Sequence, residues 1–72
     1  MIEVDVRGFS DPIPIVRTQK AIEENPNKIL IVVTETGASR DNVSRLAQSK
    51  GYSIKVEEVE DDFHVQLIPP GK

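Results

Sequence analysis

Apolar and charged side chains alternate from Ile2 to Arg7, which is the pattern of a half-buried β-strand. Gly8 ends this strand, because glycine tolerates a positive φ angle. From Pro12 to about Glu24 the spacing predicts a helix, which stops at Asn25-Pro26 since a residue before proline is driven out of the α region. The apolar side of this helix is expected to hold Ile13, Ile15, Val16, Ala21 and Ile22.

The most β-prone segment runs from Lys28 to Thr34 and contains five consecutive apolar residues, Ile29 to Val33. A strand that is apolar on both faces usually lies centrally in a sheet that is covered on at least one side. We expect Ile29, Ile31 and Val33 to face the helices. Leu30 and Val32 would then point to the open face of the sheet.

A second helix is predicted to follow the turn cluster after Thr34, with Ser39 as its N-cap. It is expected to extend to about Lys50, and Gly51 suits the position just after its end. Its buried stripe consists of Val43, Leu46 and Ala47, which have the spacing of one helix face.

Two further strands close the chain as a hairpin. Alternation from Tyr52 to Glu57 predicts the third strand, and Phe63, Val65 and Leu67 predict the fourth. The acidic cluster Glu60-Asp61-Asp62 forms the turn between them. Pro69-Pro70-Gly71 ends regular structure, so residues 68–72 are expected to begin a linker or tail.

The order β-α-β-α-β-β predicts an α/β two-layer sandwich within a single domain, residues 1–72. Right-handed crossovers place both helices on one face of a four-stranded mixed sheet. The other face would be open, and Leu30 and Val32 on it would favour self-association or docking of a second domain.

Composition narrows the class of protein further. The 72 residues carry a net charge of −3 and contain no cysteine, so disulfides and thiolate metal sites are excluded. The lone histidine, His64, lacks the ligand spacing of a metal site, and we expect neither metal nor cofactor. The negative charge and scattered aromatic residues make nucleic acid an improbable partner. Five apolar residues in a row cannot span a membrane, and the absence of a visible signal peptide favours the cytoplasm.

The stretch from Asp5 to Pro14 holds the candidate site. Pro12 is expected at the first helical position, where its missing N–H costs nothing. Asp11 before it would then cap the helix and lie at the positive end of its dipole. Arg7 either binds an anion or partner beside this helix end, or forms an ion pair with Asp5, Asp11 or a later acid. Pro14 would stiffen the same loop.

The motif Asp5-x-Arg7-Gly8-x-x-Asp11-Pro12-x-Pro14 resembles the signature of the TusA/SirA-like sulfur-carrier family. That signature is an acidic residue and Arg-Gly, followed by Cys-Pro-x-Pro at the start of the first helix. Asn42-Val43 in the second helix is closer to the YedF-type branch, which is linked to sulfur and selenium metabolism. The resemblance implies that the site loop comprises Arg7, Gly8, Asp11, Pro12 and Pro14.

In the family, the motif cysteine accepts sulfur as a persulfide from a cysteine desulfurase and passes it on. The resemblance therefore implies a cysteine desulfurase or a downstream sulfur-relay protein as partner. This chain has Asp11 at that position, and a carboxylate cannot carry a persulfide. No catalytic residue is therefore assigned, and enzymatic activity is left open.

Several functions remain compatible with Asp11 at this position. The first is a non-catalytic partner-binding or domain module in sulfur or selenium metabolism. The second is a family sulfurtransferase whose nucleophile has been mutated, and a third gives Asp11 acid-base or metal chemistry of its own. The fourth is an RNA-associated small α/β domain, by analogy with the C-terminal domain of bacterial translation initiation factor three.

Overall fold

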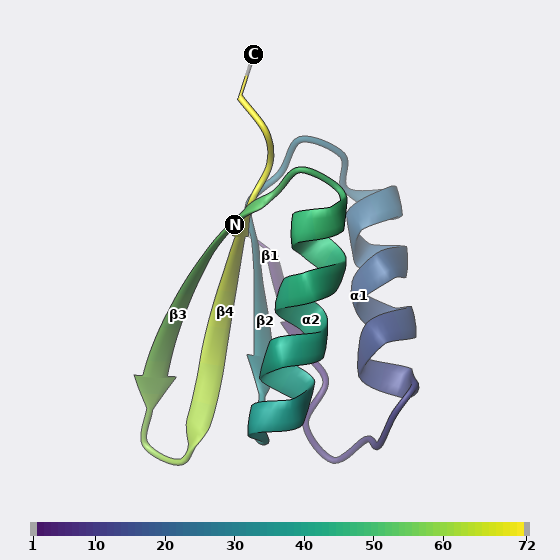
Figure 1. Ribbon diagram of the computed structural model, residues 1–72. Coiled ribbons are helices and arrows are strands. Elements are labelled where there is room, and N and C mark those ends of the chain that lie inside the picture. The colour runs from purple at the N-terminus through teal and green to yellow at the C-terminus, as the bar shows by residue number, and fades with distance from the viewer. Residues whose placement is uncertain (1, 72) are drawn as a thin grey trace.

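The computed structural model describes residues 2–71 and contains a four-stranded mixed sheet with both helices on one face (Figure 1). The elements are β1 (Ile2–Asp5), α1 (Ile13–Glu24), β2 (Leu30–Thr34), α2 (Gly37–Ser49), β3 (Ser53–Val59) and β4 (Asp62–Ile68). This confirms the predicted α/β two-layer sandwich. Lys72, at the end of the expected tail, and Met1 lie outside the described residues.

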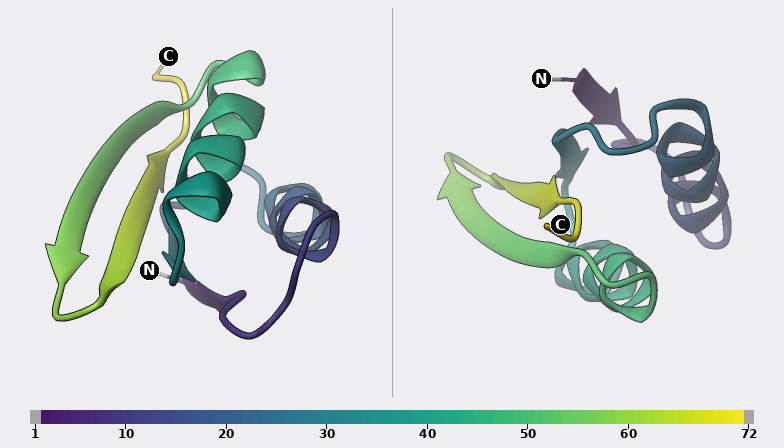
Figure 2. Two further views of the ribbon diagram at one scale, coloured as in Figure 1. Left: turned by 60° about the horizontal axis from the view of Figure 1, so that its bottom comes forward. Right: turned by 90° about the horizontal axis from the view of Figure 1, so that it is seen from above.

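The strands lie in the order β1-β2-β4-β3. β1 runs parallel to β2, whereas β4 is antiparallel to both β2 and β3. The apolar strand β2 is therefore central, as its sequence predicts, and β1 and β3 are the two edges. Figure 2 shows that α2 lies over the half of the sheet formed by β4 and β3, whereas α1 lies nearer β1.

The core lies between the sheet and the helices, and it corrects the predicted orientation of β2. Leu30 and Val32 are completely buried in the core and pair with the equally buried Leu67 and Val65 of β4. The prediction that Leu30 and Val32 face outward is therefore wrong by one residue. A run of five apolar residues has no alternation of its own, and a slip of one position exchanges the two faces of a strand.

The open face of the sheet consequently lacks the apolar patch that was expected from Leu30 and Val32. Ile31 is half-buried there, beside Gln66 of β4. Val33 pairs with Asp5 on one side and His64 on the other, and it is buried without belonging to the core cluster. Ile31 and Val33, instead of Leu30 and Val32, are therefore the apolar residues that β2 places on this face.

α1 begins at Ile13 rather than Pro12, and its buried face is narrower than predicted. Pro14, Thr18 and Ile22 form the buried stripe. The Thr18 hydroxyl donates to the Pro14 carbonyl at 2.8 Å, so a polar residue can occupy the core without an unpaired hydroxyl. Because this stripe takes the core positions, Ile13 and Val16 lie on its flank and are 39% and 55% exposed.

α2 begins earlier than predicted, at Gly37, and its N-cap is Thr36 instead of Ser39. The Thr36 side chain accepts a hydrogen bond from the Ser39 amide at 3.0 Å. Ser39 was a chemically suitable cap, but Thr36 precedes it and satisfies the same free amides. The other end agrees with the prediction, since Gly51 follows the helix with a φ of +86°.

The hairpin of β3 and β4 is confirmed, with Glu60 and Asp61 between the paired residues Val59 and Asp62. Tyr52 lies just before β3 instead of within it, and its side chain is buried in the core.

Candidate functional site

The predicted site residues lie in the loop between β1 and α1. Gly8 turns the chain there with a φ of +82°, and no atom beyond Gly8 and its two chain neighbours lies within 4 Å of the position that a Cβ would take. Backbone conformation, rather than lack of space, therefore favours glycine at this position. The Gly8 amide donates to Glu35 Oε2 at 2.9 Å, which fastens the loop to the segment preceding α2.

Asp11 does not cap α1, and this part of the sequence interpretation is wrong. Pro12 occupies the N-cap position, and no side chain makes a cap hydrogen bond there. Because the helix begins at Ile13, Asp11 lies one residue too early to reach the amides of the first turn. The Ile13 amide instead donates to the Ser10 carbonyl at 3.0 Å.

The Asp11 carboxylate turns toward α2. Its Oδ2 accepts a hydrogen bond from Asn42 Nδ2 at 3.4 Å, and the side chain is exposed. A shallow pocket lies here, lined by loop residues Gly8, Phe9, Ser10 and Asp11 and by Glu35, Thr36, Ala38 and Ser39. Asp11 is thus presented at the rim of a hollow between the loop and the start of α2.

Arg7 forms the ion pairs that were one of its two predicted roles. Its Nη2 lies 2.8 Å from Asp5 Oδ2 and its Nη1 2.9 Å from Asp62 Oδ2. The side-chain hydrogen bond from Arg7 lowers the pKa of Asp5 to about 2 from 3.8, and the two carboxylates raise the pKa of Arg7. A guanidinium bound to two carboxylates is less available for an external anion.

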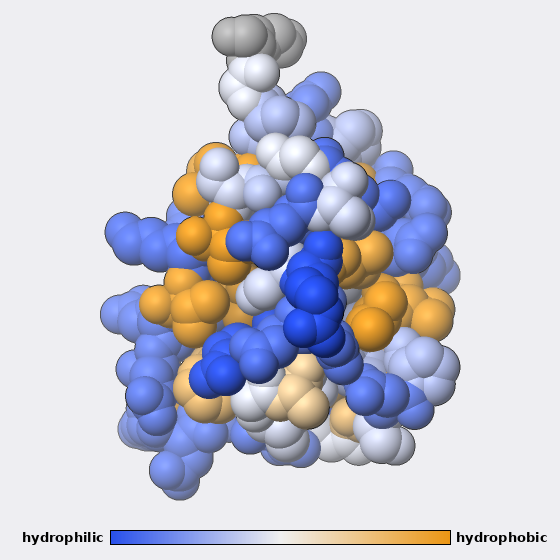
Figure 3. Space-filling model, in the orientation of Figure 1, coloured by the Kyte–Doolittle hydropathy of each residue, from blue (hydrophilic) through white to orange (hydrophobic). Residues whose placement is uncertain are grey.

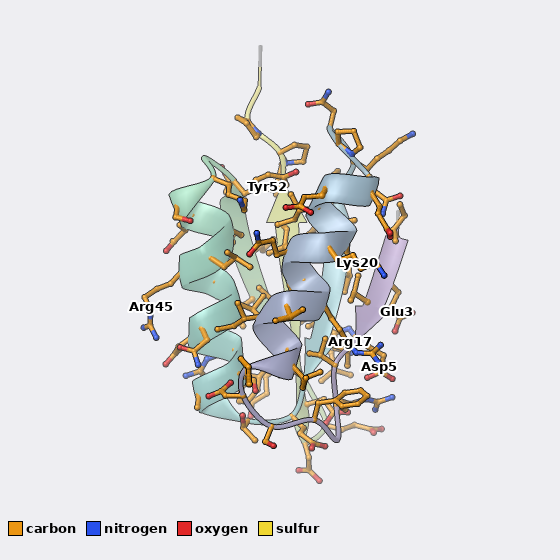
Figure 4. The ribbon with its side chains drawn as sticks, turned by 90° about the vertical axis from the view of Figure 1, so that its right-hand side faces the viewer. Glu3, Asp5, Arg17, Lys20, Arg45 and Tyr52 are labelled. Carbon is orange, nitrogen blue, oxygen red and sulfur yellow. The ribbon has the colours of Figure 1, made fainter. Side chains whose placement is uncertain are left out.

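An exposed apolar surface beside the loop was not predicted. Phe9, Ile13 and Val16 are 42%, 39% and 55% exposed, and the Arg17 guanidinium carbon lies 4.4 Å from the centre of the Phe9 ring. We call these four residues the α1 patch. Apolar surface is visible over α1 in Figure 3, and Arg17 lies on the side of α1 near β1 in Figure 4. A phenylalanine in a polar loop was the only signal of this surface in the sequence.

Three further kinds of site were considered among residues 2–71: a metal site, a cluster of basic residues on the helices and a membrane-spanning helix. No group of three or more side chains suited to a metal ion occurs in that range. Arg40 forms an ion pair with Asp41 at 2.9 Å and stacks on Phe63, while Arg45 projects from α2 away from Arg17 and Lys20 (Figure 4). None of the described helices has the length and apolarity needed to cross a bilayer.

The fold and the loop together define a small α/β protein of the sulfur-carrier type, in which an Arg-Gly turn leads into a proline-flanked helix start. The chain belongs to the TusA family, because residues 2–68 match the family described as "Sulfurtransferase TusA". It is 36% identical over 69 residues to a Methanocaldococcus jannaschii protein named "Putative sulfur carrier protein", covering 93% of this chain and 92% of that one.

A solved structure supports the same assignment. The crystal structure of a SirA-like protein from Desulfitobacterium hafniense superposes with a TM-score of 0.89 at 27% identity, over 99% of this chain and 100% of the other. Asp11 stands where the family's Cys-Pro-x-Pro motif has its cysteine, and the chain contains no cysteine elsewhere. The persulfide chemistry associated with this motif therefore has no thiol on which to proceed.

Proposed function

We propose that the chain is a partner-binding module in sulfur or selenium metabolism that engages sulfur-relay proteins without carrying sulfur itself. The observation that carries this proposal is an exposed site loop whose only departure from the quoted motif is Asp11 at the cysteine position. Sulfur transfer requires a thiolate, whereas recognition of the loop and its surroundings by a partner does not. The proposal assigns the module to the cytoplasm together with its relay partners.

The α1 patch supports a binding role. Phe9, Ile13 and Val16 expose apolar surface next to the loop, and Arg17 covers one face of the Phe9 ring. Aromatic residues and arginine are enriched in protein interfaces, and a few such residues usually carry most of the binding energy. A partner that contacts the loop would also reach this patch, because Phe9 lies in the loop itself.

The test is binding to a purified cysteine desulfurase, measured by calorimetry with the intact chain and two variants. Val16→Glu places a charge in the α1 patch and should weaken binding about tenfold or more. Val56→Glu is the matched control, since Val56 is 45% exposed but lies on β3. Absence of binding by the wild-type chain to desulfurases and to downstream relay proteins would overturn the proposal. If both variants lost affinity for the desulfurase equally, the α1 patch would not be part of the binding surface.

A further inference from the structure

β3 is an uncovered edge of the sheet. Among the described strands it pairs only with β4, and it extends over seven residues, Ser53–Val59. Ser53, Lys55, Val56, Glu57 and Glu58 are all exposed. An edge strand presents unpaired backbone donors and acceptors that can hydrogen-bond to a strand of another chain.

The charges on β3 are complementary to those of a second β3 running antiparallel to it. A two-fold axis perpendicular to the sheet leaves each side chain on the same face of the sheet. Directly opposite residues of an antiparallel pair point to the same face, whereas neighbouring residues of one strand point to opposite faces. The residue at the axis must therefore pair with the same residue of the other copy. If that residue is Val56, the middle of the strand, all seven residues are paired and Lys55 lies opposite Glu57 twice. Directly opposed charges of unlike sign stabilise an antiparallel pair.

Neighbouring registers are unfavourable by the same criterion. Centring the pair on Lys55 would set two lysines against each other, and centring it on Glu57 or Glu58 would do so with two glutamates. Like charges directly opposite each other are destabilising. Centring the pair on Ile54 opposes no like charges but pairs only residues 53–55 of the strand. Val56 is therefore the centre that pairs the whole strand and sets no like charges against each other.

The other edge strand of the sheet, β1, is less suited to pairing with a second copy of itself. β1 is only four residues long, Ile2–Asp5. Pairing of two copies about Val4 would place Glu3 opposite Asp5, which brings carboxylates together on both sides of the axis. Glu3 and Asp5 lie on this edge strand in Figure 4. Short length and repelling charges are usual protections of an edge, and β3 has neither in the Val56 register.

Val56 itself adds an apolar contact. It pairs with Val65, which is completely buried on the helix side of the sheet, yet Val56 is 45% exposed. Figures 1 and 2 show the reason, since β3 diverges from the helices along its length. In the two-fold arrangement, Val56 of each copy meets the other on this uncovered side.

We propose that two copies of this chain associate through β3, antiparallel about Val56, and form one continuous sheet with all helices on the same face. The contact involves a single strand from each copy, so it belongs to the small, weak class of interfaces. The inference does not depend on the proposed function, because the α1 patch and the site loop are not part of β3.

The test measures self-association of the full chain by sedimentation equilibrium up to millimolar concentration. Lys55→Glu and Glu57→Lys each replace two attractive pairs by two repulsive ones, and each should weaken the dimer about tenfold or more. An equimolar mixture of the two variants should associate again, since every glutamate then faces a lysine. The double variant with Lys55→Glu and Glu57→Lys should also recover wild-type association.

Lys20→Glu and Glu24→Lys provide the matched control, because they make the same charge changes at exposed positions of α1. Neither should alter the dimer, and mixing them should give no added association. A wild-type chain that stays monomeric at millimolar concentration would overturn the proposal. A dimer that is insensitive to the β3 variants, or equally sensitive to the α1 variants, would also overturn it.

Discussion

At the scale of single residues, Asp11 illustrates how the role of a side chain changes when a helix begins one residue later than predicted. Its carboxylate accepts from Asn42 on α2 and caps nothing. We therefore expect Asp11→Ala to change the free energy of unfolding by less than about 0.5 kcal/mol, as at most exposed sites. Thr36→Ala, which removes the observed cap of α2, should cost about 1 kcal/mol. Urea denaturation of both variants measures the difference, and equal losses would contradict this assignment.

The same position tests whether the loop retains the geometry for sulfur transfer. Asp11→Cys places a thiol beside the start of α1, where the helix dipole favours the thiolate. After incubation with a cysteine desulfurase and ³⁵S-labelled cysteine, we expect this variant to acquire label that dithiothreitol releases. Ser10→Cys is the control, since Ser10 is exposed in the same loop but lies outside the family position. Equal labelling of the two variants would indicate unspecific chemistry.

The ion pairs of Arg7 give stability a defined dependence on pH. The folded pKa of Asp5 is about 2, below the ordinary 3.8, so its contribution is complete above about pH 5 and is lost progressively as the pH falls through about 2. The pair is half-exposed, so screening by solvent keeps its contribution small. The stability difference between wild type and Asp5→Asn, measured by urea denaturation, should shrink from pH 5 to pH 2. A constant difference would contradict the lowered pKa.

At the scale of elements, the orientation of β2 is the clearest point to test. Leu30 is completely buried in the core, whereas Ile31 is half-buried on the open face. Leu30→Ala should cost about 2–5 kcal/mol through lost burial and the cavity it leaves. Ile31→Ala removes a similar volume from a partly solvated site and should cost clearly less. Thermal and urea unfolding compare the two variants, and the reverse order would restore the orientation predicted from the sequence.

Elements with an intrinsic period were predictable, and those without one were not. β1 alternates strictly and the hairpin alternates over most of its length, so the positions of these strands follow from the sequence. α2 buries Val43 and Ala47 as its spacing predicts, whereas Leu46 of the predicted stripe is only half-buried. The continuous apolar run of β2 contains no information on its facing, which tertiary packing decides. In α1, Thr18 lies in the core although it was not among the expected apolar residues, and its hydroxyl is satisfied by a hydrogen bond to the helix backbone.

At the site, too, features that depend on neighbouring residues were predictable from the sequence, whereas contacts that depend on tertiary packing were not. The turn at Gly8 was predictable from backbone chemistry, and the family motif gave the order of Asp11, Pro12 and Pro14. The start of α1 at Ile13, which places Pro12 at the N-cap and Pro14 inside the helix, was not predicted. The hydrogen bond between Asp11 and Asn42 joins the β1–α1 loop to α2. The bond from Gly8 to Glu35 joins the same loop to the segment before α2. Sequence spacing does not predict such contacts, because they depend on how the loop packs against α2.

At the scale of the whole molecule, the two proposed surfaces lie at opposite ends of the strand order β1-β2-β4-β3. α1 packs against β1, β2 and α2, whereas β3 contacts β4 and α2. The α1 patch and the β3 edge therefore share no element. A dimer formed through β3 would leave both copies of the site loop exposed, so each copy would present its loop and α1 patch to a partner.

This separation predicts that the two interactions are independent. Lys55→Glu should abolish most self-association while binding a cysteine desulfurase with wild-type affinity per chain. Val16→Glu should show the opposite behaviour, with weakened desulfurase binding and an unchanged dimer. Sedimentation and calorimetry on the same preparations compare both properties, and effects at sites without shared contacts are expected to be additive in the double variant. If either substitution impaired both interactions, the two surfaces would be coupled and their assignment to separate edges would be wrong.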